Sequence, residues 1–99
     1  MNLQGRKDDQ EKPQHFHLLP WEEIADVVRV LGKGAEKYAA WNWQKIDNGE
    51  MRYLNAAYRH MGKISSGEKI DPEWGLSHYA HAICSLLFAF WHSRNRSNG

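Results

Sequence analysis

The chain has 99 residues, enough for one domain with a single core and too few for two. Its composition is that of a folded protein, with 41% hydrophobic and 25% charged residues, five tryptophans and a formal net charge of +1. A charge so close to zero gives no electrostatic reason to expect a nucleic acid as partner. The single cysteine, Cys84, cannot form an internal disulfide, and the polar N-terminus does not resemble a signal peptide. We therefore expect an intracellular, cytoplasmic chain.

The N-terminal residues 1–15 are polar and lack periodicity, which predicts a flexible arm. A single helical domain is expected over residues 16–93, followed by a disordered tail over residues 94–99. The domain begins with a short apolar segment at residues 16–19. A first helix is predicted from Pro20 to about Leu31, and its buried face is formed by Ile24, Val27, Val28 and Leu31.

Two glycines, Gly32 and Gly34, interrupt this pattern and predict the end of the first helix. A shorter helical piece is expected over residues 35–41. After the turn signal at residues 47–49, a second long helix is predicted from about residue 50 to residue 64. Its core face is formed by Met51, Leu54, Tyr58 and Met61.

The most apolar stretch of the chain runs from Asp71 to His92 and predicts a central helix. Asp71 is expected to be its N-cap, with Pro72 at the first helical position. Its large apolar side chains are expected to be buried: Leu76, Tyr79, Ile83, Leu86, Leu87 and Phe90. Four polar residues share another face of the helix: His78, His81, Ser85 and His92. Such a polar stripe either contacts water or lines a site, and the sequence leaves both open.

No segment alternates as a strand does, so the predicted fold is all-α. It is a small helical bundle of three long or medium helices plus a short one. The predicted apolar faces are large for about 75 ordered residues, and we expect a dimer to cover them. The apolar part of the last helix is shorter than the ~20 residues of a membrane span, so no transmembrane segment is expected.

Metal ligands are sought first among the histidines and acidic residues. His78 and His81 are three residues apart, a spacing that can ligate a metal ion, although such pairs are more often solvent-facing or hydrogen-bonded. Asp71 and Glu73 precede them, and their alternative role is capping and stabilising the helix start. Glu22 belongs to a second acidic group, which can equally pair with a neighbouring arginine on a wet face.

Cations, amides and aromatic rings suited to holding phosphates and stacking a base occur elsewhere in the sequence. Each is also an ordinary surface residue, so none is specific alone. They are Lys37, Tyr38, Asn42, Trp43, Arg52 and Arg59.

The order of short motifs resembles the small phage and prophage family named for the N-terminal domain of dATP/dGTP diphosphohydrolase. The resemblance covers residues 9–90, and its most specific block runs from Asp71 to Ala82. The motifs are Lys12-Pro13, Leu18-Leu19-Pro20, Glu22, Gly34-Ala35-Glu36-Lys37-Tyr38, Asn42-Trp43, Arg59-His60, Gly67-Glu68, Asp71-Pro72-Glu73 and Gly75-Leu76-Ser77-His78-Tyr79-Ala80-His81-Ala82.

The resemblance implies an all-α, MazG-like nucleotide pyrophosphohydrolase. Such an enzyme needs Mg²⁺ or Mn²⁺ and cleaves a (deoxy)nucleoside triphosphate between the α and β phosphates, releasing the monophosphate and pyrophosphate. A purine deoxynucleoside triphosphate is the favoured substrate. The expected metal ligands are Glu22, Asp71, His78 and His81. The expected catalytic residues are His60, Arg59 and Lys37. His60 or a carboxylate takes the proton, and Arg59 and Lys37 hold the departing pyrophosphate. Tyr38, Asn42 and Trp43 are expected to bind substrate, with Trp43 stacking on the base.

Two other functions are compatible with the sequence. One is a helical module that binds a nucleotide or a protein without catalysis, since the acidic motifs of MazG-like enzymes are incomplete here. The other is a DNA-binding domain, suggested only by the basic tail residues Arg94 and Arg96, and the near-neutral charge argues against it.

Overall fold

A computed structural model describes residues 12–95 of the chain. Within that range the chain is helical and forms no strand, which confirms the predicted all-α class. The elements are the 3₁₀ turn η1 (Phe16–Leu18), helix α2 (Trp21–Tyr38), the 3₁₀ turn η2 (Asn42–Lys45), helix α3 (Gly49–Ser65) and helix α4 (His78–Asn95). Most of the predicted arm and of the predicted tail lies outside the described residues.

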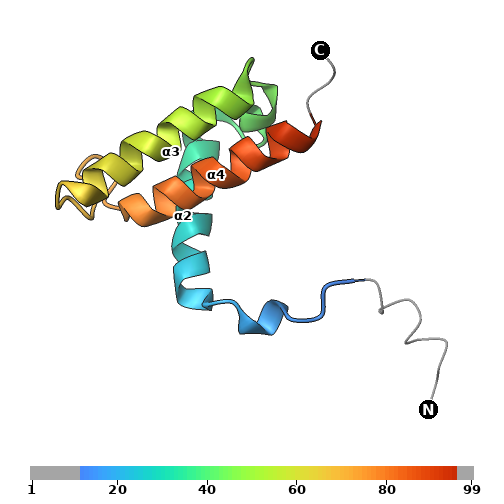
Figure 1. Cartoon of the computed structure of the whole chain (residues 1–99), viewed down its shortest axis with the longest axis horizontal. Coiled ribbons are helices and arrows are strands. Elements are labelled where there is room, and N and C mark those ends of the chain that lie inside the picture. Colours follow the sequence, from blue (N-terminus) through green and yellow to red (C-terminus); the bar gives the residue numbers. More distant parts are fainter. Residues whose placement is uncertain (1–11, 96–99) are drawn as a thin grey trace.

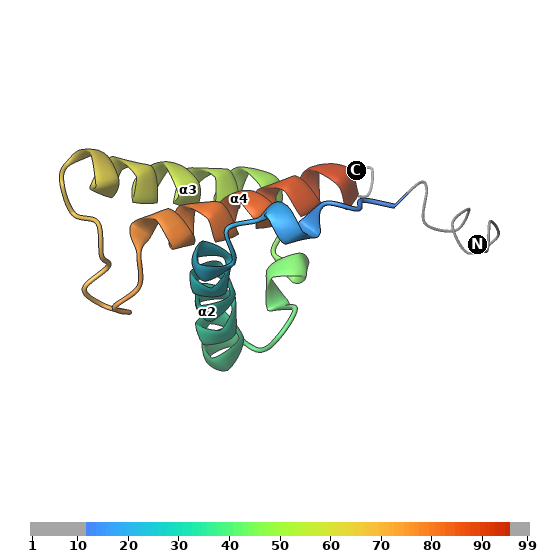
Figure 2. The same cartoon turned by 90° about the horizontal axis from the view of Figure 1, so that it is seen from below.

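Helices α3 and α4 lie side by side and run in opposite directions, and α2 crosses them on one side (Figures 1 and 2). The small core lies where α2 meets α4. It is formed by Val27 and Val30 of α2 and by Ala80 and Cys84 of α4. Partly buried side chains of Trp74, Leu76 and Phe88 pack against it. The interpretation of Cys84 as a core residue is therefore confirmed.

Helix α2 is continuous from Trp21 to Tyr38, so the predicted break at Gly32 and Gly34 is wrong. Each helical glycine costs roughly 0.5–1 kcal/mol relative to alanine, which a long helix with good helix formers around it can absorb. The helix ends at Ala39, whose φ of 89° cannot continue it. Residues 39–41, predicted as helix, form a turn instead. The second predicted helix agrees with α3 to within one residue at each end, but its predicted core face is wrong, because Met51, Tyr58 and Met61 are exposed.

The predicted start of the last helix is also wrong, because α4 begins at His78 and not after Asp71. The carboxylate of Asp71 accepts a hydrogen bond from the Glu73 N–H at 3.0 Å, and this closes a turn and not a helix. Gly75, with a φ of +73°, bends the chain back. The hydroxyl of Ser77 then accepts a hydrogen bond from the Tyr79 N–H at 3.0 Å and caps α4.

The buried face of α4 is the reverse of the expected one. Its large apolar side chains are exposed, namely Tyr79, Ile83, Leu86, Leu87 and Phe90. The small side chains and the histidines face α2 and α3 and are buried: His78, Ala80, His81, Ala82, Cys84, Ala89 and His92. Small residues let the helices approach closely, which the sequence period alone does not reveal. In α2, Val27 and Val30 are buried as the helix packs on α4, while Val28 and Leu31 are exposed.

No helix within residues 12–95 is long and apolar enough to cross a membrane.

Candidate functional site

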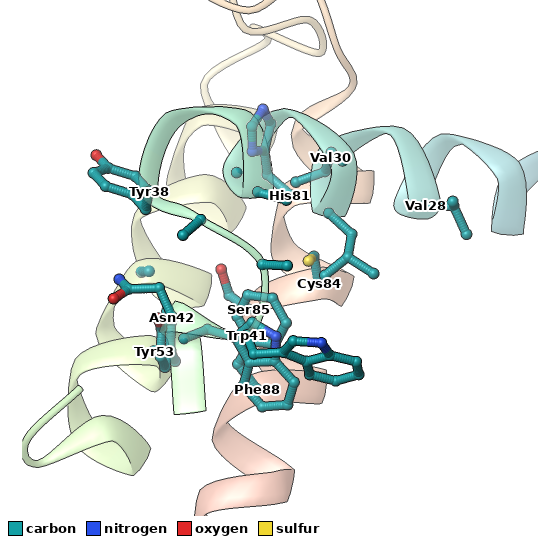
Figure 3. Close-up of a pocket in the computed structure, with 18 of the residues that line it drawn as sticks. Val28, Val30, Tyr38, Trp41, Asn42, Tyr53, His81, Cys84, Ser85 and Phe88 are labelled. Atoms are coloured by element: carbon teal, nitrogen blue, oxygen red, sulfur yellow. The ribbon is translucent and has the colours of Figure 1, made fainter. Parts of the chain in front are cut away.

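A cavity of about 470 Å³ lies between α2, η2, α3 and α4 (Figure 3). Its size falls within the range of small-molecule sites, and its wall is mostly apolar with a few polar groups. Tyr38, Asn42 and Trp43, the three residues predicted to bind substrate, all line it. So do aromatic and small residues that the sequence analysis did not single out as functional: Trp41, Tyr53, Trp74, Ser85 and Phe88.

The wall of the cavity at Trp43 is fixed by aromatic contacts. The Trp43 ring stacks on Phe88 with centroids 4.3 Å apart and an interplanar angle of 8°, and it meets the edge of Trp91 at 5.2 Å. Nε2 of His92 donates a hydrogen bond to the Trp43 carbonyl at 2.8 Å. A Cβ atom at Gly49 would lie 2.3 Å from this Nε2, so the His92 ring occupies the space that glycine leaves at the start of α3.

Three histidines and two carboxylates form a polar cluster where α3 and α4 meet the loop between them. His60 of α3 lies with its Nδ1 atom 2.9 Å from Nδ1 of His78. Nε2 of His78 lies 2.7 Å from Oε2 of Glu68. The His60 ring stacks on the His81 ring with centroids 4.5 Å apart and an angle of 7°. The cluster therefore joins residues that the sequence placed in four separate motifs, including Glu68, which was absent from the expected site residues.

The hydrogen-bond chemistry gives this chain of contacts a direction. A carboxylate only accepts, so Nε2–H of His78 donates to Glu68. A neutral His78 then has its lone pair on Nδ1 and accepts a hydrogen bond from Nδ1–H of His60. His60 is left with a lone pair on Nε2. The Glu68 carboxylate thus selects the tautomer of His60 through His78.

His81 belongs to both the cluster and the cavity wall. Its Nε2 atom lies 3.2 Å from Oδ2 of Asp71, and the two side chains are mostly buried. The pair is close enough for an ion pair but is not aligned as a hydrogen bond, so Nε2 of His81 is buried without a hydrogen-bond partner among residues 12–95. Such an atom is costly to bury unless something else satisfies it.

Burial also shifts the ionisation of the cluster and of the cavity wall. The pKa of His60 is lowered to about 4, first by burial and then by the positive charges of His81 and His78. The pKa of His81 is lowered by burial, against the opposing effect of the Asp71 carboxylate. Both imidazoles are therefore neutral at pH 7. Burial raises the pKa of Cys84 to about 11, so this cavity thiol stays protonated and is a poor nucleophile.

The other predicted catalytic and metal-binding residues lie outside the cluster. Arg59 is exposed on α3, and its charge lowers the pKa of the adjacent His60. The Nζ atom of Lys37 lies 5.2 Å from the ring centre of Tyr38 and 5.9 Å from that of Trp74, two residues of the cavity wall. Glu22 is exposed in the first turn of α2, and Glu73 is exposed in the turn before α4. The neighbouring Asp26 pairs with Arg29, which is the alternative considered for that acidic group.

The residues predicted to bind a metal ion differ in whether their atoms are placed to do so. Within residues 12–95, no group of three or more histidine, cysteine, aspartate or glutamate side chains is arranged to hold a metal ion. Both nitrogens of His78 take part in hydrogen bonds. The facing pair of Asp71 Oδ2 and His81 Nε2 is different, because its separation of 3.2 Å is close to that of two adjacent ligands of one octahedral ion at ~2.1 Å each.

The fold and the site define a small all-helical domain in which an aromatic cavity adjoins a histidine–carboxylate cluster. Residues 2–98 match the family described as dATP/dGTP diphosphohydrolase, N-terminal, and the chain belongs to this family. The resemblance noted from the motifs is therefore confirmed.

A curated relative from Salmonella phage PMBT28, named dATP/dGTP diphosphohydrolase, is 38% identical over 96 residues. The match covers 95% of this chain and 31% of the relative, so the chain spans about a third of that protein. No solved structure matches the chain. The family membership connects the chain to nucleotide hydrolases, and the activity of the whole relative is not thereby assigned to it.

Proposed function

We propose that this chain binds a purine deoxynucleoside triphosphate and takes part in its hydrolysis to the monophosphate and pyrophosphate. The observation that carries the proposal is His81, which is at once a wall of the aromatic cavity and a member of the histidine–carboxylate cluster. A nucleotide with its base in the cavity would therefore have its phosphates close to the groups that can act on them. The family and the name of the phage relative support the same substrate class.

The phosphates are assigned to the Tyr38 end of the cavity because a cation lies there. Lys37 Nζ contacts the rings of Tyr38 and Trp74, and Arg59 lies beside His60. These are the two residues expected to hold the departing pyrophosphate, and charge-assisted hydrogen bonds to phosphate are stronger than neutral ones. Asn42 and Tyr38 supply hydrogen-bonding groups in the cavity wall.

His60 is proposed to take the proton of the attacking water. In the reaction the water oxygen bonds to the α-phosphorus, the bond from that phosphorus to the α–β bridging oxygen breaks, and pyrophosphate leaves. The lowered pKa keeps His60 neutral at pH 7, and Glu68 and His78 hold its lone pair on Nε2. A neutral imidazole with a free lone pair is the state that can accept this proton.

A requirement for Mg²⁺ or Mn²⁺ is part of the proposal. Asp71 and His81 would hold the ion together with phosphate oxygens of the substrate, which is how Mg²⁺ is often bound when few carboxylates are present. The unpartnered Nε2 of His81 supports this assignment. When bound, the ion would neutralise phosphate charge and lower the pKa of the attacking water.

A second candidate function is nucleotide binding without turnover. It is favoured by the match to only 31% of the phage relative, in which the remaining two thirds could carry the reaction. We further propose that the domain self-associates, because five large apolar side chains of α4 are exposed.

The experiment is pyrophosphate release from each of the four dNTPs with Mg²⁺, with Mn²⁺ and with EDTA. We expect release from dATP or dGTP only with metal, and its loss in His60→Gln and Asp71→Asn but not in Glu22→Gln. Calorimetry with dATP in EDTA separates the two candidates, because tight binding without release under any condition favours the binding module. Absence of both binding and release would contradict the proposed substrate.

A further inference from the structure

We propose that Trp41, and not Trp43, is the aromatic side chain on which the purine base stacks. The inference rests on the nucleotide-binding function proposed above and names the residue that recognises the base. Trp41 lines the cavity, yet 64% of its surface is exposed. In Figure 3 it lies at the same end of the cavity as Ser85 and Phe88, with Tyr38 and His81 at the other end. An indole that is both at the cavity and largely uncovered has a face available for a ligand.

Trp43 has less free surface, because its ring is half-buried and already packed against other rings. Phe88 stacks on it at 4.3 Å and nearly parallel, and Trp91 meets it edge-on at 5.2 Å. Trp41 itself meets the Trp43 ring at 6.3 Å with a tilt of 40°. The Trp43 carbonyl is also held by His92. A base that stacked on the face of Trp43 covered by Phe88 would have to displace Phe88, so we assign Trp43 to the support of the cavity wall and not to the base.

The backbone around Trp41 adopts conformations that side-chain-bearing residues rarely take. Trp41 lies in the left-handed region, with a φ of 67°. Ala39 has a φ of 89° and a ψ of 147°, a combination found almost only at glycine. Neither position carries glycine. Strain of this kind is concentrated at ligand-binding sites, because the surrounding structure is selected to hold one side chain in one place. Here the side chain so held is Trp41, at the open side of the cavity.

The charge distribution indicates what kind of ligand would place an aromatic ring against Trp41. Lys37 lies beside Tyr38, and Figure 3 shows Tyr38 at the end of the cavity away from Trp41. A ligand that fits this arrangement carries an aromatic ring at one end and negative charge at the other, as a purine nucleotide does. Asn42, next to Trp41 in the chain, supplies an amide that can donate to and accept from a base edge.

The test compares calorimetric affinities for deoxyadenosine and for dATP in EDTA, so that neither metal nor turnover contributes. The variants are Trp41→Leu, Trp41→Phe and Trp43→Phe, and the matched control is Trp21→Leu, an exposed tryptophan of α2 outside the cavity wall. We expect Trp41→Leu to weaken binding of both ligands by about tenfold or more, because base–aromatic stacking is lost. Trp41→Phe should restore most of this affinity, and Trp21→Leu should leave it unchanged.

Each other outcome has a definite meaning. If wild-type protein binds dATP and Trp41→Leu binds it equally well, the stacking assignment is overturned and the proposed function stands. If Trp43→Phe weakens binding as much as Trp41→Leu while its thermal midpoint equals that of wild type, Trp43 is the stacking residue instead. If wild-type protein binds neither ligand, both the stacking assignment and the proposed nucleotide site are wrong.

Discussion

Nδ1 of His60 and Nδ1 of His78 lie 2.9 Å apart, so these two imidazoles must share a single proton between them. The contact crosses from α3 to α4 and continues to Glu68, which accepts from the other nitrogen of His78. The fold therefore determines which nitrogen of each ring carries hydrogen.

The tautomers of His60 and His78 can be measured directly. We expect ¹⁵N chemical shifts at pH 7.5 to report His60 as the Nδ1–H form and His78 as the Nε2–H form. Glu68→Ala should remove the acceptor, alter the His78 signals and destabilise the fold by about 1–3 kcal/mol, because a buried donor is left unpaired. Glu73→Ala, which removes an exposed carboxylate from the same loop, is the control. Finding His60 as the Nε2–H form in the wild type would contradict the deduced direction.

Stability should fall as the pH is lowered from about 6.5 to about 4. The pKa of His60 in the folded chain is about 4, below its ordinary value of 6.5. Between these two pH values the His60 side chain is therefore protonated in the unfolded chain but not in the folded chain. The contribution is full above pH 6.5, and partial exposure of His60 limits its loss to about 1–3 kcal/mol.

Urea unfolding at pH 7.5, 5.5 and 4.5 checks this pH dependence. His60→Gln should flatten it but not abolish it, since the pKa of His81 is also lowered. Identical pH profiles for His60→Gln and the wild type would exclude His60 as a source of the effect.

Gly49→Ala should destabilise the protein by about 1–3 kcal/mol, because the new Cβ overlaps the His92 ring and overpacks the start of α3. Gly62→Ala in the same helix is a matched control, since no atom lies within 4 Å of its Cβ position. That variant should be more stable than wild type by about 0.5–1 kcal/mol. Chemical denaturation of both variants measures the difference, and equal effects of the two would contradict the close approach of His92.

Self-association should depend on the exposed face of α4. At concentrations up to about 100 µM we expect sedimentation equilibrium to report a dimer for the wild type and a monomer for Leu87→Glu, because a charge would be buried in the interface. Met51→Glu, which places the same charge on an exposed apolar position of α3, is the control. A wild-type chain that stays monomeric over this concentration range would contradict an interface at this face of α4.

The position of α3 could be predicted from periodicity, because apolar residues recur along it at helical spacing. Periodicity says which residues of a helix share a face but not which face meets a neighbour. In α4 that choice depends on Ala80, Ala82 and Ala89, whose small side chains permit close packing, so the histidines and not the leucines became buried. The start of α4 was missed because Asp71 caps a turn as readily as a helix.

The candidate site was predictable in its residue types and not in its connections. Tyr38, Asn42 and Trp43 were grouped from their chemistry, and they do line one cavity. The pairing of Asp71 with His81 could also be predicted, since both lie in the block from Asp71 to Ala82. The role of Glu68 was not, because it depends on a tertiary contact with His78 that no spacing along the chain encodes. The sequence does not separate Trp41 from Trp43, because the two differ in exposure and ring packing, which depend on the fold.

The close approach of His92 to Gly49 makes one side of the cavity rigid. Through His92 the carbonyl of Trp43 is hydrogen-bonded to the last turns of α4, directly against the first turn of α3, so an outward movement of η2 would break this hydrogen bond. Among residues 12–95, the ring of Trp41 has one ring contact, the tilted one with Trp43. The cavity wall is therefore tightly packed at Trp43 and less constrained at Trp41, whose side chain is mostly exposed.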